Sequence, residues 1–352
     1  MCTQPEARET RLSAYAIRQN YFKDIEKYLL GFESKAVENR LNVLWVNDEQ
    51  QLVAAVTSHF KSSYNKVCFD MENVPAALSN LKSVKAIKPQ SFENQENIPD
   101  IIVTEADFAV AETGEIALLD KQTKNCFNLV RQLVIILNIN KITARRSDLD
   151  LLLSILSESK YGTSFPNDVK FIRQPFKFVE ANEFFSSDEK NYTQQDINIT
   201  VILYDDGVSE LLHNENIKEA VYCIGCGLCA KHCPVFAVSG KYTPIALVRT
   251  GIDTPAPDKI FANTTFCGNC QSVCPVAIPF HELLTKQIAV TKGSLSNRLL
   301  VKRFTKRNKM NALNNPIRRF FFLKNKFSKN KKLFNYFFSI KEDFFNIQQK
   351  EE

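Results

Sequence analysis

The sequence predicts an α/β domain followed by a smaller, α-helical, cysteine-rich domain that binds metal. Segments typical of strands and helices alternate over the first two hundred residues, which indicates a mostly parallel sheet covered by helices. Seven of the ten cysteines fall between Cys223 and Cys274. A length of 352 residues fits two domains at about 150 residues each. We place the α/β domain at 1–210, the metal-binding domain at 211–292 and a C-terminal extension at 293–352.

The composition is that of a globular protein, with 44% hydrophobic and 24% charged residues. The longest apolar runs, such as Leu133–Leu137, are far shorter than the roughly 20 residues that span a bilayer. The first ten residues, MCTQPEARET, contain no apolar stretch, so we expect no secretory signal and a cytoplasmic protein. Reducing conditions there disfavour a disulfide framework, and the clustered cysteines therefore indicate metal.

The elements of the first domain follow from apolar spacing. Apolar residues from Ala14 to Tyr28 recur three or four apart and predict one helix, ended by Gly31. Asp48 and Gln51 form a capping-box pattern that opens a helix through Phe60. A further helix is predicted over 148–156, and the polar stretch 181–196 is predicted to be a loop or linker. Short apolar runs predict strands at 41–46, 66–69, 101–104, 133–137 and 199–204, and two more at 108–110 and 116–118 around a Thr113–Gly114 turn.

The first cysteine motif, CIGCGLCAKHCP, has the spacing of a bacterial ferredoxin. Its first three cysteines, two residues apart, can wrap three corners of one iron–sulfur cube, while the fourth, followed by Pro234, points to another. The second motif, CGNCQSVCP, returns Cys274 to the first cube. This crossed pattern assigns Cys223, Cys226, Cys229 and Cys274 to a first 4Fe-4S cluster, and Cys233, Cys267 and Cys270 to a second.

The second cluster has three obvious ligands, because Val273 stands where a regular repeat would place a cysteine. It is either a three-iron cluster or a four-iron cluster with one non-cysteine ligand, for which His232 and His281 are candidates. Zinc is the competing interpretation, but a zinc ribbon uses two CxxC pairs, and seven cysteines with two Cys-Pro endings fit that pattern poorly. A purely structural role for iron is also open, although two adjacent clusters are typical of an electron relay.

Taken together, ADFAVAETGEIALL and the two cysteine motifs resemble the lactate utilisation protein B family over about residues 20–290. The resemblance implies a LUD domain, related to the NagB/RpiA/CoA-transferase-like fold, joined to a helical ferredoxin domain with two clusters. It implies an iron–sulfur electron-transfer subunit of a flavin-independent complex that oxidises L-lactate to pyruvate. The implied partners are a cysteine-rich protein and a second LUD protein.

Other functions stay open at this point. The chain could serve another dehydrogenase, of the glycolate or glycerol-phosphate type, or be a structural or sensory iron–sulfur protein. No G-x-G-x-x-G fingerprint is present, so we predict no Rossmann-type NAD or flavin site. Catalytic residues are not identifiable. Glu112, Thr113 and Gly114 form either a ligand-facing turn or an ordinary turn with solvated acids.

The C-terminal extension carries a distinct charge. Residues 298–341 hold 14 of the 45 Lys and Arg residues and no Asp or Glu, which leaves the remainder with 31 basic against 39 acidic residues. Ten Phe residues and one Tyr are interspersed over 298–345. This segment either packs on the body or a partner, or binds peripherally to the inner face of the membrane; nucleic-acid binding is the least favoured alternative.

Overall fold

A computed structural model of the chain describes residues 5–60, 66–71, 74–79, 85–87, 98–119, 121–163, 169–179, 192–250, 260 and 263–290. The C-terminal extension predicted at 293–352 lies outside these residues, and so does its predicted membrane contact. The chain divides into two compact units, one comprising Met1–Cys229 with Asn269–Pro279, and the other Ala230–Gly268 with Phe280–Glu352. This division does not follow the boundary predicted near residue 210, because the first cysteine loop groups with the α/β elements.

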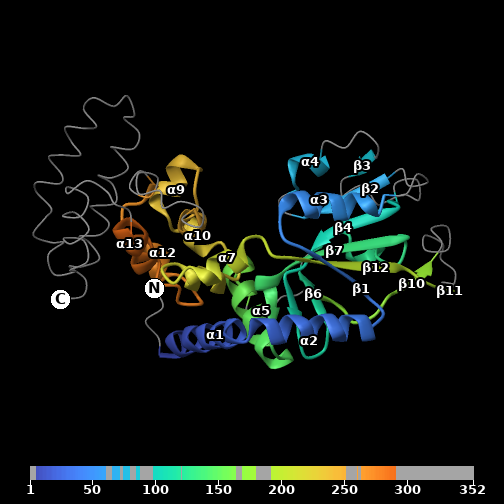
Figure 1. The fold of residues 1–352 in the computed structure, drawn as a ribbon, viewed down its shortest axis with the longest axis horizontal. Helices are drawn as coiled ribbons and strands as arrows, with labels where there is room; N and C mark the ends of the chain where they lie inside the picture. Colours follow the sequence, from blue (N-terminus) through green and yellow to red (C-terminus); the bar gives the residue numbers. More distant parts are fainter. Residues whose placement is uncertain are drawn as a thin grey trace, which may run out of the picture. The chain divides into compact units, whose positions relative to one another are not determined.

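The first unit is built on a six-stranded, entirely parallel sheet (Figure 1). Its strand order is β1-β12-β7-β4-β2-β3. The central strand β7 is buried along almost its whole length, which explains why its sequence is a continuous apolar run rather than an alternating one. The strands are β1 (Asn42–Val46), β2 (Lys66–Asp70), β3 (Lys85–Ile87), β4 (Ile101–Glu105), β7 (Gln132–Asn138) and β12 (Asn198–Tyr204).

A second sheet of four strands and a two-stranded ribbon complete the β-structure of this unit. The sheet has the order β8-β5-β6-β9, in which β5 (Phe108–Val110) pairs antiparallel with β6 (Ile116–Leu119), as the Thr113–Gly114 turn predicts. Its outer strands are β8 (Ile142–Thr143) and β9 (Val169–Ile172). The ribbon pairs β10 (Lys177–Val179) with β11 (Tyr192–Asp196), so the loop predicted at 181–196 is wrong at its C-terminal end.

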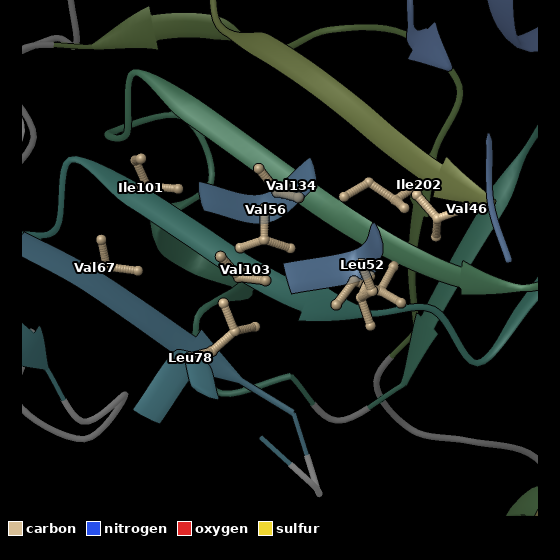
Figure 2. Packing of buried hydrophobic residues seen from close by; sticks show 10 residues of the cluster. Val46, Leu52, Val56, Val67, Leu78, Ile101, Val103, Val134 and Ile202 are labelled. Carbon is tan, nitrogen blue, oxygen red and sulfur yellow. The ribbon is translucent and has the colours of Figure 1, made fainter. Parts of the chain in front are cut away.

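Helices flank the parallel sheet. Leu52 and Val56 of α3 (Glu49–Ser58) and Leu78 of α4 (Ala76–Ser79) pack on the strand residues of one face, and Figure 2 shows the two α3 side chains among Val103, Val134 and Ile202. Helices α1 (Pro5–Lys23) and α2 (Ile25–Glu38) run along the other side of the sheet in Figure 1. Helix α5 spans Arg146–Tyr161 and contacts β5 and β8.

The predicted first helix needs a correction. It is two helices that meet at Asp24, and Gly31 lies inside α2 rather than at its end. Phe32 and Ala36 beyond the glycine are fully buried, and their packing outweighs the intrinsic cost of a mid-helix glycine, about 1 kcal/mol. By contrast, the capping prediction is confirmed, since the Asp48 carboxylate accepts the Gln51 backbone N–H at the start of α3.

The remaining elements are short. They are η3 (Lys124–Cys126), η4 (Ile139–Lys141), α7 (Val208–His213), η5 (Lys218–Tyr222), α8 (Leu228–Lys231) and α12 (Asn269–Ser272); the second unit holds α9 (Pro234–Ser239), α10 (Pro244–Arg249) and α13 (Phe280–Val290). Among the described residues, none of the helices is both long and apolar enough to span a lipid bilayer.

Candidate metal centre

The first cysteine loop begins where η5 ends and closes where α8 starts. Gly225 and Gly227 both adopt left-handed backbone conformations, with φ of 76° and 75°. Residues with a Cβ rarely adopt this conformation, so the two glycines let the chain coil tightly between the cysteines. Cys226 and Cys229 are buried and Cys223 is half-buried. The loop thus keeps two of its three cysteines away from water, within the first unit.

Cys274 belongs to the same unit as this loop, although about 50 residues separate them in the sequence. The pKa of the Cys274 thiol is raised to about 12, mainly by burial; the backbone N–H groups of Ile278 and Val276 oppose the shift, and the charges of Cys223 and Cys226 add to it. The pKa of Cys226 is also raised, mainly by burial and partly by Cys223. These mutual effects mean that the sulfurs of Cys223, Cys226 and Cys274 lie within electrostatic reach of one another.

The backbone around these cysteines fits an iron–sulfur cluster. The Gly225 N–H donates to Cys223 Sγ and the Ile278 N–H donates to Cys274 Sγ, each at 3.4 Å. The Leu228 N–H similarly lowers the pKa of Cys226, against the effect of burial. Donors of this kind stabilise thiolates and, through hydrogen bonds to sulfur, tune a bound cluster. Among the described residues, no three Cys, His, Asp or Glu side chains converge closely enough to hold a single metal ion.

The cysteines predicted for the second cluster have a different setting. Cys233 caps α9, accepting the Phe236 N–H on its sulfur at 3.4 Å, and Pro234 opens the helix as predicted. Cys267 is exposed, and Cys270 lies half-buried in α12. Cys233 and Cys267 belong to the second unit and Cys270 to the first. The ligand set and nuclearity of this cluster stay predictions.

The contacts of His232 and His281 do not identify either of them as a ligand of the second cluster. The His281 ring meets the Phe266 ring edge-on, with 5.8 Å between ring centroids, inside the second unit. His232 immediately precedes Cys233 and takes part in further interactions. Ligation of the second cluster by either histidine stays a prediction.

The turn at Glu112–Gly114 packs against α2. Gly114 has a φ of 68°, and a Cβ at this position would lie 2.7 Å from the carbonyl carbon of Lys35. The side-chain amide of Asn39, the residue that follows α2, donates to the Thr113 carbonyl at 2.9 Å. Close helix packing therefore accounts for the glycine without a ligand, while a ligand-facing role for Glu112 and Thr113 stays a prediction.

Two buried cations near the first loop escaped sequence analysis. The Arg18 guanidinium, on α1, donates to the carbonyls of Ile142, Asn140 and Val221. The Lys141 ammonium donates to the Ile224 carbonyl inside the loop at 2.7 Å. One signal was available for Arg18, because it falls on the apolar stripe of its helix, between Ala14 and Tyr21. Lys141 follows an apolar strand with no pattern that marks it.

Comparison with known proteins supports the metal assignment. Residues 219–278 match the family model of the 4Fe-4S dicluster domain. This segment contains all seven clustered cysteines. The match shows that the region is of an iron–sulfur type.

Curated relatives match a larger part of the chain. Lactate utilization protein B 1 of Bacillus mycoides is 28% identical over 200 residues, covering 53% of this chain and 38% of the relative. Lactate utilization protein B of Macrococcus caseolyticus is 25% identical over 301 residues, covering 80% of this chain and 57% of the relative. The crystal structure of a DUF162 family protein from Deinococcus radiodurans aligns with a TM-score of 0.37 at 12% identity, over 51% of this chain and 97% of that one.

The alignments with these relatives thus take in between about two fifths and three fifths of each relative's own length. The chain is thus similar to lactate utilization protein B proteins over part of their length, and its residues 219–278 match a 4Fe-4S dicluster domain.

Proposed function

We propose that this chain is the iron–sulfur electron-transfer subunit of a flavin-independent complex that oxidises L-lactate to pyruvate. The observation that carries the proposal is the set of buried cysteines with N–H donors on their sulfurs, in a chain related to lactate utilization protein B. Burial and N–H donors suit a centre that changes charge by one electron at a time, because both control its reduction potential.

The electron count supports two clusters. Oxidising the hydroxyl of L-lactate to the ketone of pyruvate releases two electrons and two protons. When bound, two iron–sulfur clusters supply two one-electron carriers. We propose that Cys223, Cys226, Cys229 and Cys274 hold the first and that Cys233, Cys267 and Cys270 hold the second.

The chain's own residues then have distinct tasks. Burial keeps Cys226, Cys229 and Cys274 away from water, and backbone N–H groups donate to the sulfurs of Cys223 and Cys274. The buried thiols would have to lose their protons to bind iron, and the N–H donors would then stabilise the thiolates. We propose that the carbon chemistry takes place with the help of partner subunits, a cysteine-rich protein and a second LUD protein.

The proposal is tested by disrupting the gene and measuring growth on L-lactate, glycolate and glycerol. We expect the disrupted strain to lose growth on L-lactate but to keep growth on glycolate and glycerol. Growth on L-lactate should return when the intact gene is supplied. A Cys226→Ser copy is the matched control and should not restore growth. Loss on glycolate or glycerol with normal growth on L-lactate would assign the chain to another dehydrogenase.

A second measurement separates electron transfer from a structural role. Anaerobically purified protein should contain about eight iron atoms if both sites hold four-iron clusters, or about seven if the second holds three. Dithionite should reduce the clusters, and a mild oxidant should return them to the oxidised state. Electron paramagnetic resonance measures both steps. Clusters that cannot be reversibly reduced would contradict the electron-transfer role.

A further inference from the structure

The feature that carries a further inference is the Lys141 side chain, which reaches from the sheet into the first cysteine loop. Lys141 ends η4, directly after the central strand β7 and the short turn that follows it. Its ammonium donates to the carbonyl of Ile224, the residue after Cys223, at 2.7 Å. A cation that follows the central strand by three residues therefore contacts the backbone next to the first ligand.

The loop is shaped to receive this ammonium. A Cβ on Gly225 would lie 2.8 Å from Lys141 Nζ, closer than carbon and nitrogen approach without a shift. Gly225 thus serves two purposes, a left-handed backbone conformation and room for the cation. The ammonium also lies 5.7 Å from the centre of the Phe108 ring, a favourable cation–π distance.

More anionic than cationic groups surround the Lys141 ammonium. Burial lowers its pKa, while Asp107, Cys223 and Glu105 oppose that shift, and Lys160 adds to it. Arg18 is a second buried cation within electrostatic reach of Cys223. Two cations of the first unit, from α1 and from the end of β7, therefore act on the same ligand.

A nearby cation affects the two oxidation states of a cluster differently. Reduction adds one negative charge to a centre that is already anionic because of its four thiolates. A positive charge attracts the reduced state more strongly than the oxidised one and so raises the reduction potential. The interaction between two charges falls only in inverse proportion to their distance, so an effect of measurable size is expected even when the charges are not in contact.

We propose that Lys141 is a positioning and tuning residue, whose ammonium holds the first cysteine loop at Ile224 and raises the reduction potential of the cluster bound there. This inference rests on the proposed function in one respect, the presence of a redox-active cluster on Cys223, Cys226, Cys229 and Cys274. It adds that the α/β domain controls this cluster electrostatically. The second cluster has no part in the effect.

The test is an anaerobic redox titration of the full chain, followed by electron paramagnetic resonance. Lys141→Gln removes the charge but can still donate to Ile224, and Lys141→Met removes both. At the wild-type midpoint potential, we expect the reduced-to-oxidised ratio of one cluster to fall about tenfold in both variants, a shift of roughly 59 mV for one electron. Lys141→Arg should keep most of the wild-type potential, and Lys35→Met, which removes an exposed lysine paired with Glu38, should change nothing.

The outcomes separate cleanly. A Cys226→Ser variant should lack the signal that moves, which identifies it as the first cluster. Unchanged midpoints in Lys141→Gln would overturn the inference while leaving the proposed function intact. A wild-type chain without reducible clusters would instead overturn the proposed function. If Lys141→Met fails to fold, Lys141→Gln alone decides the test. Loss of the cluster in both Lys141→Gln and Lys141→Arg would mean that Lys141 is required for cluster assembly, and it would also overturn the inference of tuning by charge.

Discussion

The two sets of cysteines differ in their burial and in how they are distributed over the two units. Of the first set, Cys226, Cys229 and Cys274 are buried, all four members belong to the unit built on the parallel sheet, and cations lie close by. The second set is more exposed and is distributed over both units. The comparison shows that protein packing buries most of the first set, whereas it leaves the second set more accessible to solvent.

Replacing single cysteines is the strongest test of this contrast. Cys226→Ser and Cys274→Ser should each remove the same cluster, because the crossed pattern makes them ligands of one centre. Cys267→Ser should remove or alter the other. Iron analysis and electron paramagnetic resonance measure both effects, with a loss of about four iron atoms expected for the first pair. If Cys274→Ser and Cys267→Ser affect the same cluster, the crossed ligation is wrong.

Substitutions in the core of the parallel sheet should lower the free energy of unfolding without changing the iron content. Leu52 is 3% exposed and packs in the core under α3, so Leu52→Ala should lower the free energy of unfolding by about 2–5 kcal/mol. Leu30→Ala is the matched control, because Leu30 is 55% exposed and should change stability by less than about 0.5 kcal/mol. Denaturant unfolding followed by circular dichroism measures both. Equal effects would contradict the assigned core.

Two glycines with left-handed backbone in the α/β unit should differ in how much stability is lost when each is replaced by alanine. Gly162→Ala should cost about 1–2 kcal/mol, because its φ is 74° but nothing lies within 4 Å of an added Cβ. Gly114→Ala meets the backbone of α2 as well and should cost about 1–3 kcal/mol more. Thermal unfolding compares the variants. A Gly114→Ala protein as stable as Gly162→Ala would show that α2 yields easily and would return attention to a ligand at this turn.

The smallest predicted effect concerns helix capping. Asp48→Ala removes the acceptor of the Gln51 N–H at 2.8 Å and should destabilise the chain by about 1 kcal/mol. Asp24 precedes α2 without a side-chain capping bond, so Asp24→Ala should have the smaller effect. Urea unfolding of the two variants checks the difference. A larger loss for Asp24→Ala would contradict the assignment of Asp48 as the effective cap.

Local patterns were sufficient for much of the sheet unit. The apolar runs of β4, β7 and β12 are continuous because these strands are buried on both faces, and this composition is visible in the sequence. Strands β1 and β2 also stand out as apolar runs, although β1 is largely exposed and β2 is only partly buried. The three-residue edge strand β3 and the polar ribbon strand β11 were missed, because pairing with a neighbour decides their conformation. Gly31 misled for the same reason, because burial of Phe32 and Ala36 sustains α2 beyond it.

The sequence by itself determined that residues 219–278 are of an iron–sulfur type, because the cysteine spacing carries this signal and the dicluster match agrees with it. Only the tertiary structure decided which other groups act on those cysteines. Lys141 lies 82 residues before Cys223 and Arg18 lies 205 residues before it, yet both come within electrostatic reach of it. Electrostatic interaction depends on distance in space, and folding alone brings residues so far apart in the chain together.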